Sequence, residues 1–385
     1  MSSNLKVLQV IPKLGFGGAE TGCYDLAHYL SEQGCKSYIV TSGGELLKFI
    51  KKEKVKVFKL PVHSKNPVLI IFNAIAISFI VLIFNIDIIH ARSRAPAWSC
   101  LWSSFITRKK YVTTFHGTYN ISSPLKFFYN SVMVRSKLII AGSNFIFNHI
   151  NKNYQKFLKS NSKLLVIFRG INLDFYSKKN ISEKSKNLLI KHWNLDVEKI
   201  TILLPGRLTK WKGQELLIEA LNIIIEDYAK SNFQAIILGS NQGRNIYSKK
   251  LHGLVERYRL GTKIKFINHC KEMPLAYSVS DIVVSSSIEP EAFGRVAVEA
   301  QAMEKPIIAS DIGGSKETIL NEKSGFLYKA GDPRELAKVL NNVMELDKEA
   351  LYSIGNEGRK NVTKKFDVDK MCHTTLTEYK KLFKK

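Results

Sequence analysis

Short apolar runs alternate with longer stretches of helical periodicity along almost the whole chain. The first series comprises KVLQVI, SYIVTS, VKVFKL, DIIHA, YVTTF, LIIAGS and LLVIF, and the second comprises ITILLPG, QAIILGS, KIKFIN, DIVVSSS, PIIAS and GFLYK. Strands separated by helices in this way are typical of parallel sheets with crossover connections. Each series is long enough for its own sheet. The pattern therefore predicts an α/β protein with two Rossmann-like, doubly wound domains facing a central cleft.

A polar, lysine-rich stretch separates the two series and predicts the domain boundary. We expect an N-terminal domain over 1–175, a linker region over 176–199 and a C-terminal domain over 200–366. Residues 367–385 have helical periodicity and could pack against either domain, including back on the N-terminal one. The length of 385 residues agrees with two domains, because single cores stop growing at roughly 250 to 300 residues.

One apolar segment, VLIIFNAIAISFIVLIF at 68–84, is interrupted only by Asn73 and Ser78. It falls just short of the ~20 residues that a membrane-spanning helix needs. Pro67 favours a helix start, and the run leads directly into the strand-like IDIIHA. We expect a helix that packs on a sheet or dips partly into a membrane interface, with a spanning helix as the less favoured alternative.

The formal charge of +25 is concentrated in the N-terminal half. Residues 1–170 hold 23 Lys and Arg against 6 Asp and Glu, a net of +17, which leaves +8 for the other 215 residues. Such a field attracts nucleic acid, anionic lipid headgroups or phosphorylated substrates. A lysine-rich genome is the alternative explanation. The first candidates for contact with an anionic membrane are Lys51, Lys52, Lys54, Lys56, Arg108, Lys109 and Lys110.

The five cysteines, at 23, 35, 100, 270 and 372, are scattered without CxxC spacing, which predicts neither a zinc site nor a disulfide framework. The start of the chain has no basic region followed by a small-residue cleavage site. We therefore expect a cytoplasmic protein, with peripheral attachment to the inner face of the plasma membrane as an open possibility.

A glycine-containing turn follows the first strand of each series. Gly15, Gly17 and Gly18 precede a helix near Ala19, where backbone amides could approach a phosphate; a tight turn without a ligand is the alternative. In the second half, Gly206 and Arg207 end a strand, and Lys212 opens the next helix. Two cations in such a position suit a diphosphate, because they neutralise charge on a leaving group. A pair of surface cations is the alternative there.

The strongest local pattern is a pair of carboxylates, Glu291 and Glu299, with seven residues between them. Glu291 stands in the loop after DIVVSSS, and Glu299 lies inside the helix that starts near Phe293. Carboxylates so placed can hold a sugar and a ribose, while the free N–H groups of the helix start face the phosphates between them. The alternative is a solvated acidic face of the helix.

Eight motifs then occur in family order: GGAE, HARSRAPAW, TTFHG, FRGINLDFY, GRLTKWKG, NHCKEMPLAY, EPEAFGRVAVEAQAM and DIGGSKET. Together they resemble the retaining group 1 (family 4) glycosyltransferases with the two-domain GT-B fold, whose bacterial members commonly build lipopolysaccharide and capsule. The resemblance spans nearly the whole chain. It implies an N-terminal acceptor-binding domain, a C-terminal domain for a nucleotide-sugar donor, a glycan or glycolipid acceptor, and no cofactor or metal.

The resemblance also implies roles for individual residues. Arg207 and Lys212 would grip the diphosphate, Glu291 the hydroxyls of the transferred sugar, and Glu299 the ribose. Further donor contacts would come from Gly206, Phe293, Gly294 and the amides near Val296, with base contacts near 269–273. In the N-terminal domain, Gly17 and Gly18 would face the donor, and His116 would reach the transferred sugar. Taken alone, a histidine at a strand end is more often structural.

One residue departs from the family pattern, because Glu304 stands where the resemblance expects glycine after the helix. A left-handed conformation there would cost about 1 kcal/mol.

Two other functions remain as alternatives: a nucleotide-sugar epimerase of the same fold, and a basic nucleic-acid-binding protein. The second explains the charge but not the paired carboxylates, and no basic stripe interleaved with aromatics is present. We therefore expect no nucleic-acid partner.

Overall fold

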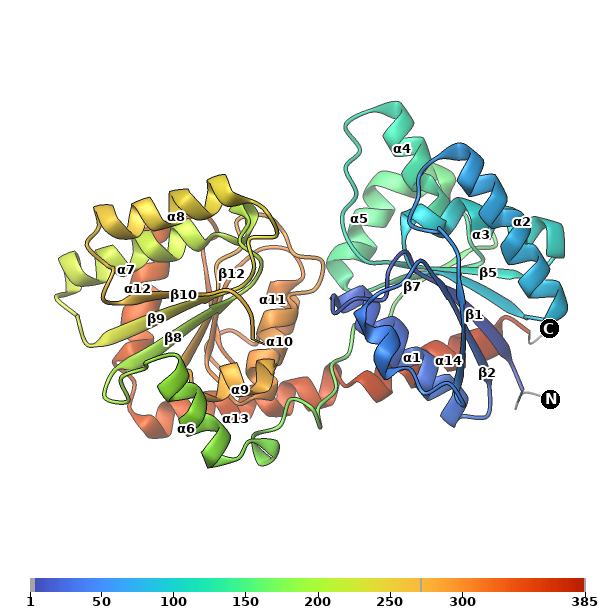
Figure 1. The fold of residues 1–385 in the computed structure, drawn as a ribbon. Coiled ribbons are helices and arrows are strands. Elements are labelled where there is room, and N and C mark those ends of the chain that lie inside the picture. The colour runs from blue at the N-terminus through green and yellow to red at the C-terminus, as the bar shows by residue number, and fades with distance from the viewer. Residues whose placement is uncertain (1–3, 271, 384–385) are drawn as a thin grey trace. The chain divides into compact units, whose positions relative to one another are not determined.

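The computed structural model describes residues 4–270 and 272–383 and divides into two compact units. The first unit contains the chain up to Gly170 together with the segment from Val368 onward, and the second is Ile171–Asp367. Each unit is an α/β body built on one parallel sheet (Figure 1). The two predicted Rossmann-like domains are therefore confirmed.

The sheet of the first unit has seven parallel strands in the order β3-β2-β1-β4-β5-β6-β7. Its strands are β1 (Lys6–Val10), β2 (Lys36–Thr41), β3 (Val55–Lys59), β4 (Ile88–Ala91), β5 (Lys110–Phe115), β6 (Leu138–Ala141) and β7 (Lys163–Val166). The helices are α1 (Gly18–Glu32), α2 (Pro67–Ile83), α3 (Arg94–Thr107), α4 (Pro124–Asn130), α5 (Asn144–Tyr154) and α14 (Val368–Lys381), with short 3-10 turns η1 (Glu45–Phe49), η2 (Ser131–Val134) and η3 (Gln155–Phe157).

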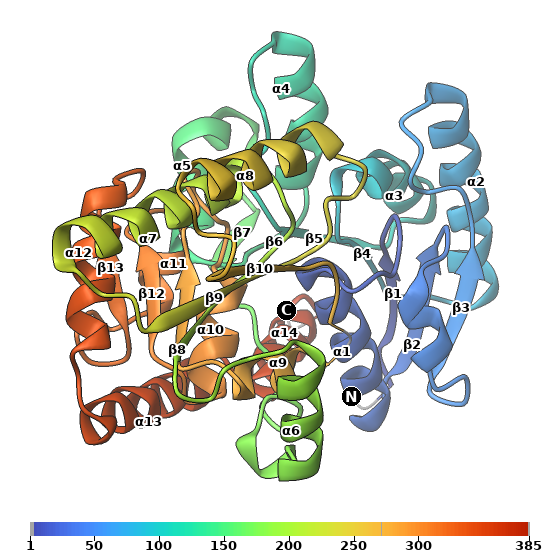
Figure 2. The same cartoon turned by 60° about the vertical axis from the view of Figure 1, so that its left-hand side comes forward.

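The helix α14 closes the first unit, although it is the last element of the chain. It runs beside α1 (Figures 1 and 2) and buries Cys372, Leu376 and Tyr379 against the sheet. The hydroxyl of Tyr379 also lies 2.6 Å from Nδ1 of His90 at the centre of the sheet. The segment 367–385, which the sequence leaves free to join either domain, therefore contributes α14 to the first.

The sheet of the second unit has six parallel strands in the order β10-β9-β8-β11-β12-β13. Its strands are β8 (Ile200–Pro205), β9 (Phe233–Leu238), β10 (Ile264–Ile267), β11 (Ile282–Ser285), β12 (Ile307–Ser310) and β13 (Phe326–Tyr328). The helices are α6 (Glu183–His192), α7 (Gln214–Tyr228), α8 (Asn245–Arg257), α9 (Met273–Ser278), α10 (Arg295–Ala302), α11 (Ser315–Thr318), α12 (Pro333–Met344) and α13 (Lys348–Lys365), with turns η4 (Lys178–Asn180) and η5 (Lys210–Lys212).

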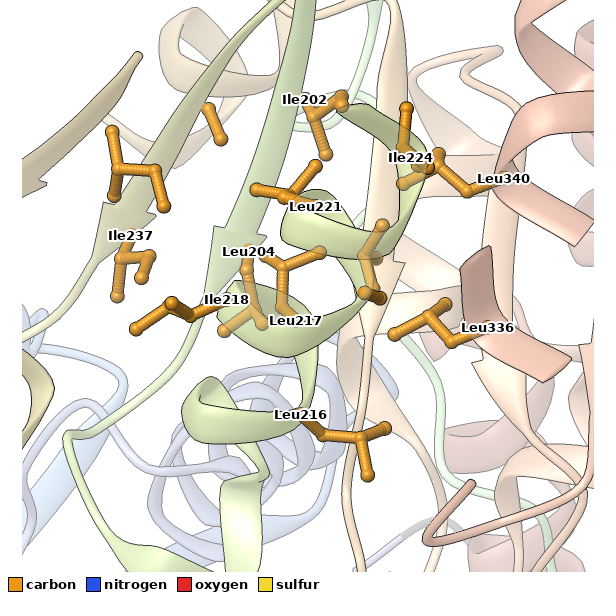
Figure 3. Packing of buried hydrophobic residues seen from close by; sticks show 14 of the residues in the cluster. Ile202, Leu204, Leu216, Leu217, Ile218, Leu221, Ile224, Ile237, Leu336 and Leu340 are labelled. Atoms are coloured by element: carbon orange, nitrogen blue, oxygen red, sulfur yellow. The ribbon is translucent and has the colours of Figure 1, made fainter. Parts of the chain in front are cut away.

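The main core of the second unit lies between its sheet and the helices α7, α8 and α12. Leu217, Leu221 and Ile224 follow the i, i+4, i+7 spacing of one helix face and are fully buried, as Figure 3 shows. They meet strand residues such as Ile202 and, from α12, Leu340. Each such side chain contributes about 1.5–3 kcal/mol on burial. This core fixes β8 and hence the loop that follows it.

The second unit begins earlier than the sequence predicts. Residues 176–199, expected as a linker, form η4 and α6 and belong to this unit. Trp193 is buried there, and the carbonyl oxygen of Trp193 accepts a hydrogen bond from Lys265 at 3.1 Å. Asp196 is likewise tied to β9, since its carbonyl oxygen accepts from Gln234 at 2.8 Å. The many lysines cover the outside of a packed segment.

The apolar segment 68–84 forms α2, which begins at Pro67 as the sequence predicts. Asn66 caps the helix by accepting a hydrogen bond from the amide of Val68 at 2.9 Å. Within the part of the chain that the structure describes, no helix is long and apolar enough to cross a membrane.

Candidate active site

Both sheets reverse their strand order next to their first strand. The reversal falls between β1 and β4 in the first unit and between β8 and β11 in the second. Ligands of open α/β sheets bind outside the carboxyl ends of the strands at such a switch point. Gly17 and Gly18 follow β1, while Arg207 and Lys212 follow β8 and Glu291 follows β11. The predicted site residues therefore lie where each sheet is expected to bind a ligand.

The turn after β8 is shaped by two glycines. Gly206 has a φ of 158° and leads into Arg207, whose side chain is exposed. Gly213 has a φ of 69°, and a Cβ there would collide with the carbonyl oxygen of Ser286. Ser286 also donates a hydrogen bond to the carbonyl oxygen of Gly213 at 2.8 Å. The loops after β8 and β11 are thus held in direct contact.

Lys212 and Glu291 meet across these two loops. The ammonium group of Lys212 donates to Oε1 of Glu291 at 2.7 Å, and the hydroxyl of Ser287 donates to the same oxygen at 2.6 Å. Burial raises the pKa of the Glu291 carboxyl, but the charge of Lys212 and these hydrogen bonds outweigh it, so that the pKa lies below its ordinary value. Glu291 is therefore held as a carboxylate.

The helix α10 begins beside this pair. Its N-cap is Gly294, at a φ of 84°, where a Cβ would lie only 2.7 Å from Cα of Ser315. Phe293 is buried and packs against Phe366 with 5.5 Å between the ring centroids. Val296 lies in the first turn, where amides have no acceptor within the helix. The start of α10 is thus an electropositive helix end next to Glu291.

Glu299 lies one turn further along α10 and is 5% exposed. Its Oε1 accepts from Nε of Arg295 at 2.5 Å, and its Oε2 accepts from the hydroxyl of Tyr277 at 2.8 Å. Carboxylate oxygens can each accept more than one hydrogen bond, so a ribose hydroxyl could still be bound. Glu299 therefore also has a structural role that the sequence does not reveal.

In the first unit, the predicted residues lie at the start of α1 and directly after the end of β5. Gly17 is the N-cap of α1, and a Cβ there would collide with the carboxylate of Glu20. Gly18 and His116 line one small cavity, of about 20 Å³, together with Arg92 and Arg169. This volume admits one small polar group. The structure thus brings Gly18 and His116 together at the carboxyl edge of the sheet.

His116 is held in one hydrogen-bonding state by Arg169. Nη2 of Arg169 donates to Nδ1 of His116 at 2.5 Å, so the neutral imidazole carries its proton on Nε2. Burial, followed by the charges of Arg169 and Arg92, keeps the pKa of His116 well below its ordinary value. Nε2 is buried and has no hydrogen-bond partner among residues 4–270 and 272–383. His116 is therefore placed to donate a hydrogen bond to a ligand.

Arg92 is the second buried cation at this cavity, and it is 5% exposed. Its Nη1 donates to Gln9 at 3.0 Å, while Nε has no partner within the described part of the chain. Arg92 lies in the motif HARSRAPAW and Arg169 in FRGINLDFY, but the sequence predicted no role for either residue. Both arginines stand just after strand ends, at β4 and β7. That position is the signal that could have identified them.

The predicted base-contact segment lies between β10 and α9. Lys271 within it lies outside the described residues. Cys270 donates a hydrogen bond to the carbonyl oxygen of Glu272 at 3.3 Å, and α9 begins at Met273. The segment therefore follows a strand at the carboxyl edge of the second sheet.

Comparison with known proteins agrees with this architecture. Residues 16–175 match the model of Glycosyltransferase Family 4, and residues 185–361 match that of Glycosyl transferases group 1. A solved glycosyltransferase from Rickettsia africae ESF-5 is 35% identical, with a TM-score of 0.89 and 99% of each chain covered. Anabaena HepE, solved in complex with UDP-glucose, is 23% identical, with a TM-score of 0.81 and 98% of this chain and 100% of that chain covered, and shares the fold.

A curated relative matches over a shorter length. Spore coat protein SA of Bacillus subtilis is 29% identical over 235 residues, which cover 59% of this chain and 61% of that protein. The two parallel sheets and the likeness to the solved glycosyltransferase from Rickettsia africae define the GT-B fold. The chain belongs to the group 1 glycosyltransferase family.

Proposed function

We propose that the protein transfers a sugar from a nucleotide-diphosphate donor to a glycan or glycolipid acceptor of the cell surface, as in lipopolysaccharide or polysaccharide synthesis. The observation that carries this proposal is the contact between Lys212 and Glu291 at the switch point of the second sheet, beside the start of α10. A nucleotide-sugar donor is further supported by HepE, which shares the fold and was solved with UDP-glucose.

In this proposal the second unit binds the donor. Arg207, Lys212 and the first amides of α10 neutralise the diphosphate, and Glu291 accepts hydrogen bonds from hydroxyls of the sugar. Glu299 binds the ribose through the acceptor sites that Arg295 and Tyr277 leave open. Cations and free helix N–H groups are the groups that stabilise the charge of a departing diphosphate.

The reaction proceeds with retention. The bond between the anomeric carbon and the β-phosphate oxygen breaks, and the acceptor oxygen forms its bond on the same face. The hydroxyl proton passes to an oxygen of the departing diphosphate. The protein then contributes positioning and charge stabilisation rather than a nucleophile of its own. Because Arg207 and Lys212 supply the positive charge, we expect activity to persist in excess chelator.

A panel of UDP- and GDP-sugars tests the proposal. The purified protein should release nucleoside diphosphate and free sugar by slow hydrolysis of one donor, and the first sugar formed should keep the anomeric configuration of the donor. An epimerase would instead yield an isomerised sugar. Inversion at the anomeric carbon would overturn the retaining mechanism, and no release from any donor would overturn the function.

A further inference from the structure

The helix α2 buries its two polar residues and leaves a row of large apolar residues exposed. Asn73 and Ser78 are 1% and 5% exposed, and the side chain of Asn73 donates to the carbonyl oxygen of Pro61 at 3.2 Å. Seven apolar residues are each at least 50% exposed: Val68, Ile71, Phe72, Ile75, Phe79, Leu82 and Ile83. A surface helix facing water has the opposite arrangement. This face of α2 is therefore unsuited to water.

The neighbouring helix α3 repeats the inversion. It buries Ser99, Ser103 and Ser104, while Phe105 and Ile106 are 61% and 60% exposed. Ser99 donates to the carbonyl oxygen of Ile70 at 2.8 Å, which ties α3 to α2, and both views show the helices side by side (Figures 1 and 2). Helix pairs that pack through small residues and turn large apolar ones outward are common in lipid. We call the exposed side of α2 and α3 the apolar face.

Basic side chains border the apolar face where α2 and α3 end. Nζ of Lys56 lies 4.3 Å from the ring centroid of Phe84, and Nζ of Lys159 lies 5.6 Å from that of Phe105. Lys109 donates to Asn85 at 3.0 Å, directly after α2. Residues 54–173 contain 17 Lys and Arg but a single acidic residue, Asp87. The segment of the chain that carries the apolar face is thus almost without negative charge.

The charge decides between the occupants that could cover such a face. A second copy of the chain would bring the same basic border against this one, and like charges at close range repel. An anionic bilayer offers an apolar layer for the exposed side chains and negative headgroups for the cations. Aromatic residues such as Trp102 also favour the headgroup region.

We infer that the apolar face lies in the surface of an anionic bilayer, with α2 inserted along the interface and Lys56, Lys109 and Lys159 among the headgroups. This inference goes beyond the proposed function and rests on it only in that a glycolipid acceptor would be met at this surface. Lys54, a candidate from the sequence, is instead paired with Glu32 at 2.7 Å.

Flotation with vesicles of phosphatidylglycerol and phosphatidylcholine tests the inference. The full chain should float with the mixed vesicles and not with pure phosphatidylcholine. A part of the binding should survive high salt, because salt screens the headgroup contacts but not the burial of apolar side chains. The fluorescence of Trp102, on the apolar face, should be quenched by lipids that carry a shallow quencher, and Trp102→Phe should remove that signal.

Two matched triple variants distinguish insertion of α2 from non-specific binding of exposed apolar side chains to vesicles. Ile71→Ser, Ile75→Ser and Phe79→Ser together should weaken vesicle binding about tenfold or more and make the remainder fully salt-sensitive. The control carries Leu188→Ser, Val197→Ser and Ile246→Ser, which replace exposed apolar residues of the second unit, and should bind like the wild type. All six positions are at least 50% exposed, so both variants should keep the melting temperature of the wild type.

Three results would overturn the inference: no flotation of the wild type at low salt, equal binding by the two triple variants, or conversion of a dimer into a monomer by the apolar-face variant alone. The last would assign the face to a second copy. Donor hydrolysis without vesicles, measured on the same samples, keeps the two proposals apart. Hydrolysis without flotation would leave the proposed function standing, and flotation without hydrolysis would leave the membrane face standing.

Discussion

Lys212 and Glu291 form an ion pair at 2.7 Å that joins the loop after β8 to the loop after β11. The two side chains are 79 positions apart in the sequence and are only 13% and 10% exposed. A buried pair of this kind is costly to break, because removal of one partner leaves the other charge uncompensated. The pair therefore adds to the contacts of Ser286 with Lys212 and Gly213, which also join the two loops that carry the proposed donor site.

Glu291→Gln should slow transfer with every donor sugar while leaving the affinity for free nucleoside diphosphate nearly unchanged. The amide keeps the size of the carboxylate but loses the charge that Lys212 and Ser287 stabilise, and the proposed contact of this residue is with the sugar. Calorimetric titration with UDP and GDP measures the affinity. A large loss of nucleotide affinity would mean that Glu291 binds another part of the donor.

Glu299→Gln should weaken binding of the nucleotide itself, because its proposed ligand is the ribose. The substitution also disturbs the contacts with Arg295 and Tyr277, so Arg295→Gln serves as the control for a purely structural effect. If Arg295→Gln lowers nucleotide affinity as much as Glu299→Gln, the ribose assignment is wrong. Circular dichroism should show that both variants remain folded.

Arg169→Met should make turnover depend on pH in a range where the wild type does not. A lowered pKa means that the neutral imidazole of His116 persists until the pH falls to that lowered value. Loss of the Arg169 charge raises the pKa of His116 toward about 6.5, so protonation then begins at higher pH. The pH profile of kcat measures this effect.

Arg169→Gln is the matched variant for His116, because its amide can still donate to Nδ1. It should restore more of the rate at neutral pH than Arg169→Met does. Identical profiles for Arg169→Met and the wild type would contradict the assignment of Arg169 as the residue that positions His116.

Glu304→Gly should raise the free energy of unfolding of the second unit by about 1 kcal/mol. Glu304 has a φ of 55°, as the missing glycine of the family pattern predicts, and its partly exposed ion pair with Lys178 contributes little. Urea unfolding compares it with Glu304→Ala, which removes the same ion pair but keeps the strained φ. The strain argument fails if the glycine variant is no more stable than the alanine variant.

The strands and the site segments could be predicted because buried parallel strands read as continuous apolar runs, as in KVLQVI and ITILLPG. Side-chain contacts between residues far apart in the sequence could not be predicted. The contact of Tyr379 with His90 spans 289 positions and decides which unit holds α14. The donation from Arg169 to His116 spans 53 positions and depends on β5 and β6 lying side by side, with β7 next in order.

The segment 176–199 was misassigned for a different reason. Its lysines give it the composition of a linker, and two buried aromatic side chains, Tyr176 and Trp193, are too weak a pattern to reveal packing. For α2 the sequence correctly predicts a helix. It does not show which side of the helix faces the sheet, because both sides are apolar. Only the fold shows that Asn73 and Ser78 mark the buried side.

The most direct test of the proposed donor site is the turnover of nucleotide sugars by the wild type, Arg207→Ala and Lys212→Ala. Each variant should lower turnover by two orders of magnitude or more, which corresponds to ~3 kcal/mol of lost transition-state stabilisation. Lys210→Ala, which removes an exposed cation from the same loop, should keep the wild-type rate. Near-normal turnover by both Arg207→Ala and Lys212→Ala would contradict the assignment of these cations to the donor diphosphate.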